Sequence, residues 1–162
     1  MRASPLKTAA SWLIMALLLI QFIPLSRSNP PESSPLIAPE KITVILKKAC
    51  FDCHSFKTKW PLPAYIAPVS WTAYAKVNQG RHALNFSQWG NSSKTGVVQK
   101  MQIIRKTVLN SNSHEPLYYA LNPHSGLTPA ERTILLNWID TFQNERFTGF
   151  KNSGSTPPDK NC

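Results

Sequence analysis

Apolar residues recur at intervals of three and four through much of the chain, which is the spacing of an amphipathic helix. One predicted helix covers residues 40–49, with an apolar face made of Ile42, Ile45, Leu46 and Ala49. A second runs from Pro68 to Gln79, with proline in its first turn and Gly80 just past its C-terminus. A third covers residues 96–109, and its apolar face consists of Val97, Met101, Ile104 and Val108.

The last predicted helix has the clearest start. Thr128 is in the N-cap position, Pro129 fills the first helical position, and Glu131 completes a Thr-x-x-Glu capping box. A broad apolar face follows, made of Ile134, Leu135, Trp138, Ile139 and Phe142. Because no segment alternates between apolar and polar residues at the period of a strand, the sequence predicts an all-α fold.

The N-terminal region contains a different pattern, an uncharged apolar run from Ala9 to Ile23. Arg2 and Lys7 precede the run, so the positive-inside rule predicts a cytoplasmic N-terminus and an exported remainder. The run is as long as a signal-peptide core and slightly short of a comfortable membrane span of about 20 residues. Residues 1–28 are therefore interpreted as a signal or anchor segment, and cleavage stays open.

Composition also predicts the boundaries of the folded domain. Residues 29–39 contain four prolines in eleven positions, which is typical of an extended tether. Residues 151–162 are rich in proline, serine, asparagine and glycine and are expected to form a flexible tail. The domain itself is predicted to cover residues 40–150, enough for a modest core and one buried cofactor.

The chain is basic, with 18 Lys+Arg against 8 Asp+Glu and a net charge of +10. Arg2, Lys7 and Arg27 flank the apolar run, and without them 15 basic and 8 acidic residues leave a net charge of +7. These charges are scattered rather than clustered into a stripe, which argues against nucleic acid as a partner. An acidic protein, anionic lipid or an anionic cofactor remains open. With 42% apolar residues, the 162-residue chain is not a disordered basic tail.

The strongest chemical motif is Cys50-Phe-Asp-Cys53-His54, which has the C-x-x-C-H form of a c-type haem attachment site. In such sites the two sulfurs form thioethers with the porphyrin vinyl groups, and the next residue, His54, becomes the proximal iron ligand. Covalent haem attachment takes place outside the cytoplasm, which agrees with the export predicted from the N-terminus.

Three other interpretations of the cysteines were weighed. A thioredoxin-like C-x-x-C pair needs a βαβ setting that a helical chain lacks. A zinc site needs a second close pair of ligands, and Cys162 is remote in the predicted tail. A disulfide between Cys50 and Cys53 would leave His54 without a role. The purpose of Cys162 stays open.

From Gln21 to Trp138 the sequence resembles the bacterial membrane-anchored haem-binding domain family, a cytochrome c-like group. The matching pieces are Gln21-Phe-Ile-Pro24, Asn29-Pro-Pro31, Cys50-x-Asp-Cys-His-Ser55, Thr58-Lys-Trp-Pro61, Ile66-Ala-Pro-Val-Ser-Trp71, Gly80-Arg-His-x-Leu-Asn-Phe-Ser-x-Trp89 and Leu127-Thr128. The resemblance implies one covalently bound haem c in a domain on the periplasmic side of the inner membrane. It also implies an uncleaved N-terminal helix as the anchor, and it defines the cofactor more firmly than the activity.

The sequence departs from the family at one position. Members usually have Gly-Glu-Met-Pro, whose methionine is the natural sixth haem ligand, where this chain has Ser113-His-Glu-Pro116. Glu115 occupies the methionine position, so His114 is the predicted sixth ligand and Met101 the runner-up. A vacant or water-bound sixth site is the remaining alternative.

These features predict an electron carrier rather than an enzyme. A haem-based sensor would need a vacant or labile sixth site, and a peroxidase-like enzyme would have to use Glu115, His114 and Arg81 as distal groups. Arg81 is also predicted to pair with a haem propionate, although a solvated surface position fits it equally well. Asn85 and Ser87 are expected to hold loop backbone by side-chain hydrogen bonds.

Overall fold

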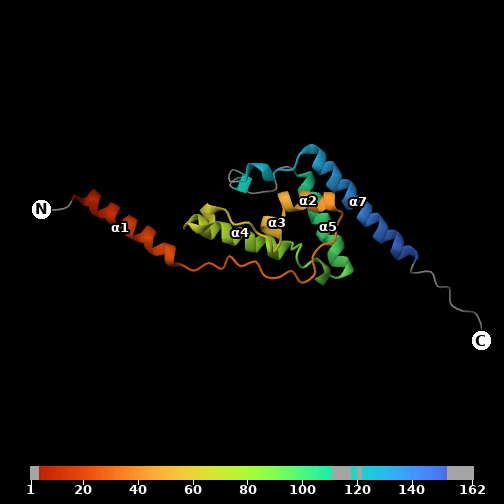
Figure 1. Ribbon diagram of the computed structural model, residues 1–162, viewed down its shortest axis with the longest axis horizontal. Helices are drawn as coiled ribbons and strands as arrows, with labels where there is room; N and C mark the ends of the chain where they lie inside the picture. The colour runs from red at the N-terminus through yellow and green to blue at the C-terminus, as the bar shows by residue number, and fades with distance from the viewer. Residues whose placement is uncertain (1–3, 111–117, 120–121, 153–162) are drawn as a thin grey trace, which may run out of the picture. The chain divides into compact units, whose positions relative to one another are not determined.

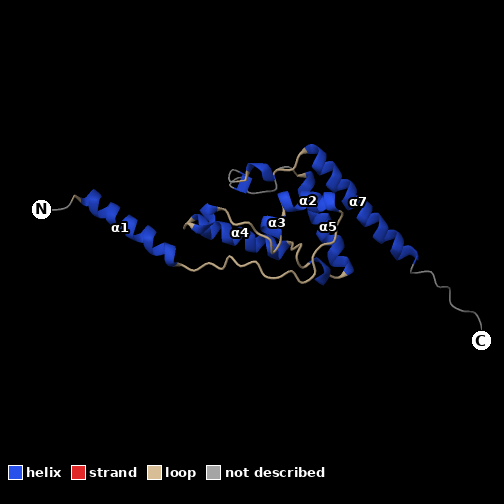
Figure 2. Cartoon of the chain, viewed as in Figure 1, coloured by secondary structure: helices blue, strands red, loops and turns tan. Residues whose placement is uncertain are grey.

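The computed structural model describes residues 4–110, 118–119 and 122–152 (Figure 1). Over these residues the regular structure consists of helices, and none of them belongs to a β-strand (Figure 2). The all-α prediction is confirmed. An isolated parallel bridge joins Ser34 to Gln88.

The chain divides into two compact units, Met1–Pro35 with Cys50–Gln88, and Leu36–Ala49 with Trp89–Cys162. We call them the motif unit and the helical unit, after the C-x-x-C-H motif and the three long helices. The motif unit contains α1 (Pro5–Leu19), the 3-10 helices η1 (Ile20–Phe22) and η2 (Leu62–Tyr65), α3 (Phe51–His54) and α4 (Val69–Ala83). The helical unit contains α2 (Glu40–Ala49), η3 (Trp89–Asn91), α5 (Lys94–Leu109), η4 (Pro123–Ser125) and α7 (Pro129–Asn152).

The apolar run at the N-terminus forms α1 and η1. Together they make an 18-residue helical stretch, Pro5–Phe22, that is long and apolar enough to cross a membrane by length and composition. None of it is buried against the rest of the protein, and Trp12, Leu18 and Phe22 are exposed. A membrane anchor and a signal sequence both fit this helix.

Aliphatic packing holds the helical unit together. Helix α7 packs against α5 and α2, and the buried side chains of the unit include Ile42, Leu46, Met101, Ile104, Leu135 and Ile139. Helix α2 has the predicted bounds, and α5 begins two residues before the predicted start because Ser93 caps it by accepting a hydrogen bond from the Gly96 N–H at 3.1 Å.

The predicted capping box of α7 is confirmed. The Glu131 N–H donates to the Thr128 hydroxyl at 3.2 Å, and the Thr128 N–H donates to the Glu131 carboxylate at 2.8 Å. Lys48 of α2 donates to the same carboxylate at 2.7 Å. The cap therefore also connects α7 to α2.

In the motif unit, α3 and η2 both pack against α4. The rings of Phe51 and Phe86 are buried and stack with their centroids 5.3 Å apart, forming an apolar contact beside the motif. The predicted end of α4 is wrong: Gly80 lies inside the helix, which continues to Ala83. Gly80 has no positive φ and does not act as a C-cap; its role is a close contact with the motif, described below.

Candidate haem site

The C-x-x-C-H motif forms one turn of helix. Helix α2 ends at Ala49, Cys50 makes a turn, and α3 begins at Phe51. The N–H groups of Cys53 and His54 donate to the Cys50 carbonyl at 3.3 and 3.0 Å, which closes the turn. Both cysteines are partly exposed free thiols, so the structure contains no disulfide between them.

Two backbone carbonyls fix the imidazole of His54. Its Nδ1 lies 2.9 Å from the Gly80 carbonyl oxygen and 3.0 Å from the Leu84 carbonyl oxygen. Because a carbonyl can only accept, Nδ1 must carry the proton in the neutral ring. The lone pair that can bind a metal is therefore on Nε2. A backbone acceptor on one ring nitrogen is the usual way in which proteins orient a histidine ligand and raise its basicity.

Gly80 allows α4 to approach the motif closely. A Cβ built at this position would overlap the Cys53 carbonyl oxygen and would lie 3.0 Å from the Cys53 carbonyl carbon and 3.1 Å from the Cys53 Cβ. The same close approach brings the Gly80 carbonyl to the His54 ring. The absence of a side chain at residue 80 is thus a condition for the geometry of His54.

The two thiols are held in their neutral form. Burial raises the pKa of Cys50 to about 12, with the neighbouring Cys53 thiolate adding to the effect. Burial and Asp52 raise the pKa of Cys53 to about 11, against a smaller lowering by Arg81. Redox-active C-x-x-C pairs depend on a thiol with a lowered pKa. This pair has the opposite property, which disfavours the thioredoxin-like interpretation.

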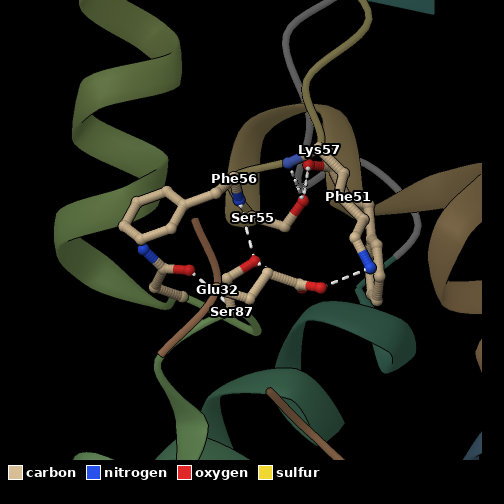
Figure 3. Close-up of polar contacts among 7 residues, drawn as sticks. Glu32, Phe51, Ser55, Phe56, Lys57 and Ser87 are labelled. Atoms are coloured by element: carbon tan, nitrogen blue, oxygen red, sulfur yellow. Dashed lines mark hydrogen bonds and ion pairs between the residues drawn. The ribbon is translucent and has the colours of Figure 1, made fainter. Parts of the chain in front are cut away.

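A buried hydrogen-bond network supports the segment after His54 (Figure 3). The Ser55 hydroxyl donates to the Phe51 carbonyl at 2.7 Å and accepts from the Lys57 N–H at 2.9 Å. The Ser87 hydroxyl accepts from the backbone N–H of residue 56 at 2.9 Å and donates to the Glu32 carboxylate at 2.9 Å. Lys57 pairs with the other oxygen of that carboxylate at 2.5 Å. Glu32, in the segment between η1 and α2, is therefore bound to both Ser87 and Lys57 beside the motif.

The residues predicted to hold loop backbone do so. The Asn85 side-chain oxygen accepts from the Ser87 N–H at 2.9 Å, and the Phe86 N–H donates to the His54 carbonyl at 2.8 Å. The stretch after α4 therefore runs alongside the motif and ends in the Ser87 contacts described above. This confirms the structural role expected of Asn85 and Ser87.

Arg81 directs its guanidinium toward protein acceptors. It donates to the Ser55 carbonyl at 2.9 Å, the Ser28 carbonyl at 3.2 Å, the Asn29 side-chain oxygen at 2.7 Å and the Thr58 hydroxyl at 2.9 Å. These contacts join three segments of the motif unit and suit a positioning residue. The predicted pairing of Arg81 with a haem propionate stays a prediction.

Sequence reasoning did not identify two features near the motif. The Asp52 side chain accepts from the Lys59 N–H at 3.0 Å, and the Asp52 carbonyl accepts from the Thr58 hydroxyl at 2.7 Å, which folds residues 58–60 back over the motif. The indole Nε1 of Trp60 is buried, and within the part of the chain that is described it has no hydrogen-bond partner. A buried donor of this kind requires an acceptor. No pattern in the sequence could indicate that the Trp60 Nε1 is buried away from an acceptor.

Of the two candidates for the sixth ligand, only Met101 is among the described residues. Met101 is fully buried on α5, where it forms part of the core. His114 and Glu115 lie outside the described residues, as does Cys162. Among the residues that are described, no three His, Cys, Asp or Glu side chains gather closely enough to hold a metal ion by themselves.

The residues of the motif unit fit a haem. Two free, neutral thiols lie close to His54 in sequence, Cys53 directly before it and Cys50 one helical turn before it, and backbone contacts place the lone pair of the His54 ring on Nε2. The buried indole Nε1 of Trp60 has no acceptor among the described residues. Haem supplies matching groups in its vinyl carbons, its iron and its propionate carboxylates. A single protein nitrogen suffices on one face of the iron, so the site needs no cluster of ligands.

Comparisons with known proteins agree with this fit. A model of the haem-binding domain family matches residues 15–141, a range that includes the apolar helix from its middle, the motif and most of α7. A comparison with curated proteins gives no match, and neither does one with solved structures. The family match covers well over half of the chain, and the chain therefore belongs to the haem-binding domain family.

Proposed function

We propose that this haem-binding protein is a c-type cytochrome of the bacterial cell envelope that carries single electrons. The observation that carries the proposal is the His54 ring, fixed through Nδ1 by the Gly80 and Leu84 carbonyls beside the free thiols of Cys50 and Cys53. When bound, haem iron supplies one-electron chemistry between its ferrous and ferric states. His54 Nε2 would be the proximal ligand.

The two thiols would hold the porphyrin covalently. Each S–H would add across one vinyl C=C bond, with the sulfur bonding to one vinyl carbon and the hydrogen going to the other. The addition consumes no external oxidant or reductant. The raised pKa values of Cys50 and Cys53 keep both sulfurs as thiols at neutral pH, which protects them from the oxidation that thiolates undergo before the cofactor arrives.

The surrounding residues would tune and orient the cofactor. With two carbonyl acceptors on Nδ1, His54 would be a stronger electron donor to the iron, which would favour the ferric state and lower the reduction potential. The buried Trp60 N–H would donate to a propionate. His114 would be the sixth ligand and Met101 its alternative. A histidine in place of methionine would lower the potential further.

We also propose that α1 remains uncleaved and anchors the domain at the periplasmic side of the inner membrane. Two positive charges at the N-terminal end support this orientation, since Arg2 precedes the helix in sequence and Lys7 lies in its first turn, and the exposed apolar side chains of Pro5–Phe22 are available to lipid. The redox partner would then be a protein of the same envelope.

Absorption spectra of the purified full chain with and without carbon monoxide test electron transfer against ligand sensing. An electron carrier should be low-spin in both oxidation states and unaffected by carbon monoxide. His114→Ala should convert the haem to high-spin and allow carbon monoxide to bind, whereas the control Met101→Leu should leave the spectrum unchanged. Rapid binding of carbon monoxide by the unmodified protein would overturn the electron-carrier proposal in favour of a sensor or a peroxidase-like enzyme.

A further inference from the structure

The segment from Trp60 to Trp71 has an unusual surface for a domain exposed to water. It contains no charged residue, and its Ser70 is buried. Its outward side chains are apolar or aromatic, with exposed fractions of 82% for Leu62, 55% for Tyr65 and 60% for Ile66. We call these three residues the η2 face, because they lie in η2 and directly after it.

The side chain of Gln21 ties this segment to the end of the apolar helix. Its Oε1 accepts from the Ala67 N–H at 3.0 Å, and its Nε2 donates to the Ala67 carbonyl at 3.3 Å and to the Leu17 carbonyl at 3.0 Å. The amide thus pairs with both backbone groups of Ala67 while remaining attached to the last turns of α1. Residues 66–67 are therefore held at the level of Phe22, where the membrane-compatible stretch ends.

A second contact lies one step further from the helix. Arg27 donates to the Ala64 carbonyl at 2.9 Å, and its guanidinium lies over the Tyr65 ring at 4.8 Å from the centroid. The exposed Lys59 precedes the segment on its other side. Positive charge therefore adjoins the apolar residues, from Arg27 against Tyr65 and from Lys59 just before the segment in sequence. This is the arrangement of a surface that inserts at the boundary between phospholipid headgroups and acyl chains.

We propose that the η2 face docks into the headgroup boundary of the same bilayer that α1 crosses, so that the motif unit lies on the membrane surface in a fixed orientation. The segment that carries the η2 face is hydrogen-bonded to the anchor through Gln21, and Arg27 and Lys59 would meet the lipid phosphates. The proposal rests on the anchoring role of α1. In this arrangement Gln21, the first residue of Gln21-Phe-Ile-Pro24, attaches the domain to its own membrane helix.

Photo-crosslinking of the haem-loaded full chain in vesicles of phosphatidylethanolamine and phosphatidylglycerol tests the docking. A benzophenone amino acid replaces Leu62 or Ile66 in separate samples, Leu18 as the positive control and Gln79 as the negative control. Gln79 is exposed in the same unit and lies ten residues along α4 from Val69, about 15 Å away. Docking predicts lipid adducts at residues 62 and 66 several-fold above residue 79.

The controls separate two ways in which the idea could fail. Strong lipid labelling at residue 18 with residues 62 and 66 at the level of residue 79 would overturn the docking and leave the anchor intact. Labelling absent at residue 18 as well would overturn the anchor and the docking together. In these vesicles lipid is the only partner offered, so a face made for another protein would give the first of these results.

A substitution tests the lock itself. Gln21→Ala removes both contacts with Ala67 and should lower lipid labelling at residues 62 and 66 several-fold while labelling at residue 18 persists. Gln102→Ala, an exposed glutamine on α5, is the matched control and should change neither. Unchanged labelling in the Gln21 variant would contradict the role given to this side chain.

Discussion

The two units of the molecule are stabilised by different forces. The helical unit buries a continuous set of aliphatic side chains, including Leu46, Met101, Leu135 and Ile139, each fully or almost fully inaccessible. The motif unit buries fewer large apolar groups but hides many polar ones, namely Ser55, Thr58, Ser70, Asn85 and Ser87. The helical unit follows ordinary rules of helix packing, whereas the motif unit is a set of backbone segments held in place by hydrogen bonds.

This difference follows from what each unit has to do. A helical core is stabilised by burying apolar area and tolerates small shifts between helices. The proposed ligand His54 would have to point in one direction, and the hydrogen bonds that its Nδ1–H donates to the Gly80 and Leu84 carbonyls provide that orientation. The motif unit buries few large apolar side chains of its own, and a bound haem would add apolar surface to its core. We expect it to gain more stability from haem than the helical unit does.

The largest expected effect is on the cofactor itself. His54→Ala removes the proposed proximal ligand and both hydrogen bonds of its ring, so it should abolish the wild-type haem spectrum and leave the haem high-spin or lost. Absorption spectra of the oxidised and reduced protein measure this. His82→Ala is the control, because His82 is an exposed histidine of the same helix α4 and should leave the spectrum unchanged. An unaltered spectrum in the His54 variant would remove it as the ligand.

The next effect is on the stability of the helical unit. Leu135→Ala deletes a fully buried side chain from α7 and should lower the free energy of unfolding by about 2–5 kcal/mol. Chemical denaturation followed by circular dichroism measures the change. Ile103→Ala truncates an exposed side chain of α5 and should cost no more than about 0.5 kcal/mol. Equal losses from the two variants would contradict the assigned core.

Two glycines offer a matched comparison. Gly80→Ala puts a methyl group against the Cys53 backbone and should destabilise the protein by about 1–3 kcal/mol, although glycine to alanine inside a helix normally stabilises it. The haem absorption spectrum should change as well, because the Gly80 carbonyl that holds the His54 ring is displaced. Gly126→Ala is the control, since a Cβ there meets nothing within 4 Å. A stabilising Gly80→Ala would show that the close approach is not required.

The smallest effect concerns the cap of α7. Hydrogen bonds from Lys48 and Thr128 lower the pKa of Glu131 below its ordinary value. Its contribution to stability is therefore complete above the unfolded pKa and disappears as pH falls through the lower folded pKa. Glu131→Gln should cost about 1 kcal/mol at neutral pH and less in acid, measured by denaturation at several pH values. A loss that does not shrink in acid would contradict this account.

The features of the helical unit were easier to predict from sequence than those of the motif unit. Helices α2, α5 and α7 were predictable because their apolar faces repeat along the chain, and the capping box fixed the start of α7 at Pro129. Cys50, Cys53 and His54 could be proposed as site residues from the sequence because the chemistry of a C-x-x-C-H motif depends on local spacing. No local pattern indicates that Gly80 lies inside α4, where a side chain would clash with the Cys53 backbone. That clash exists only because segments distant in sequence come together in the fold.

The same limit applies to the partners of polar groups. The sequence identifies Arg81 as a permanent cation but not the four protein acceptors that surround it. It also gives no sign that the Trp60 Nε1 is buried with no acceptor among the described residues. Such contacts join residues that are far apart in the sequence. They depend on tertiary structure, which periodicity does not encode.

The central claim is that haem is held covalently through Cys50 and Cys53 and ligated by His54. Denaturing mass spectrometry of the protein purified from a host that attaches c-type haem tests it most directly. The account predicts a mass increase equal to one haem that survives denaturation and disappears in Cys50→Ala/Cys53→Ala, while Cys162→Ala retains it. Haem that separates from the unmodified chain on denaturation, or remains bound to the double variant, would contradict the claim.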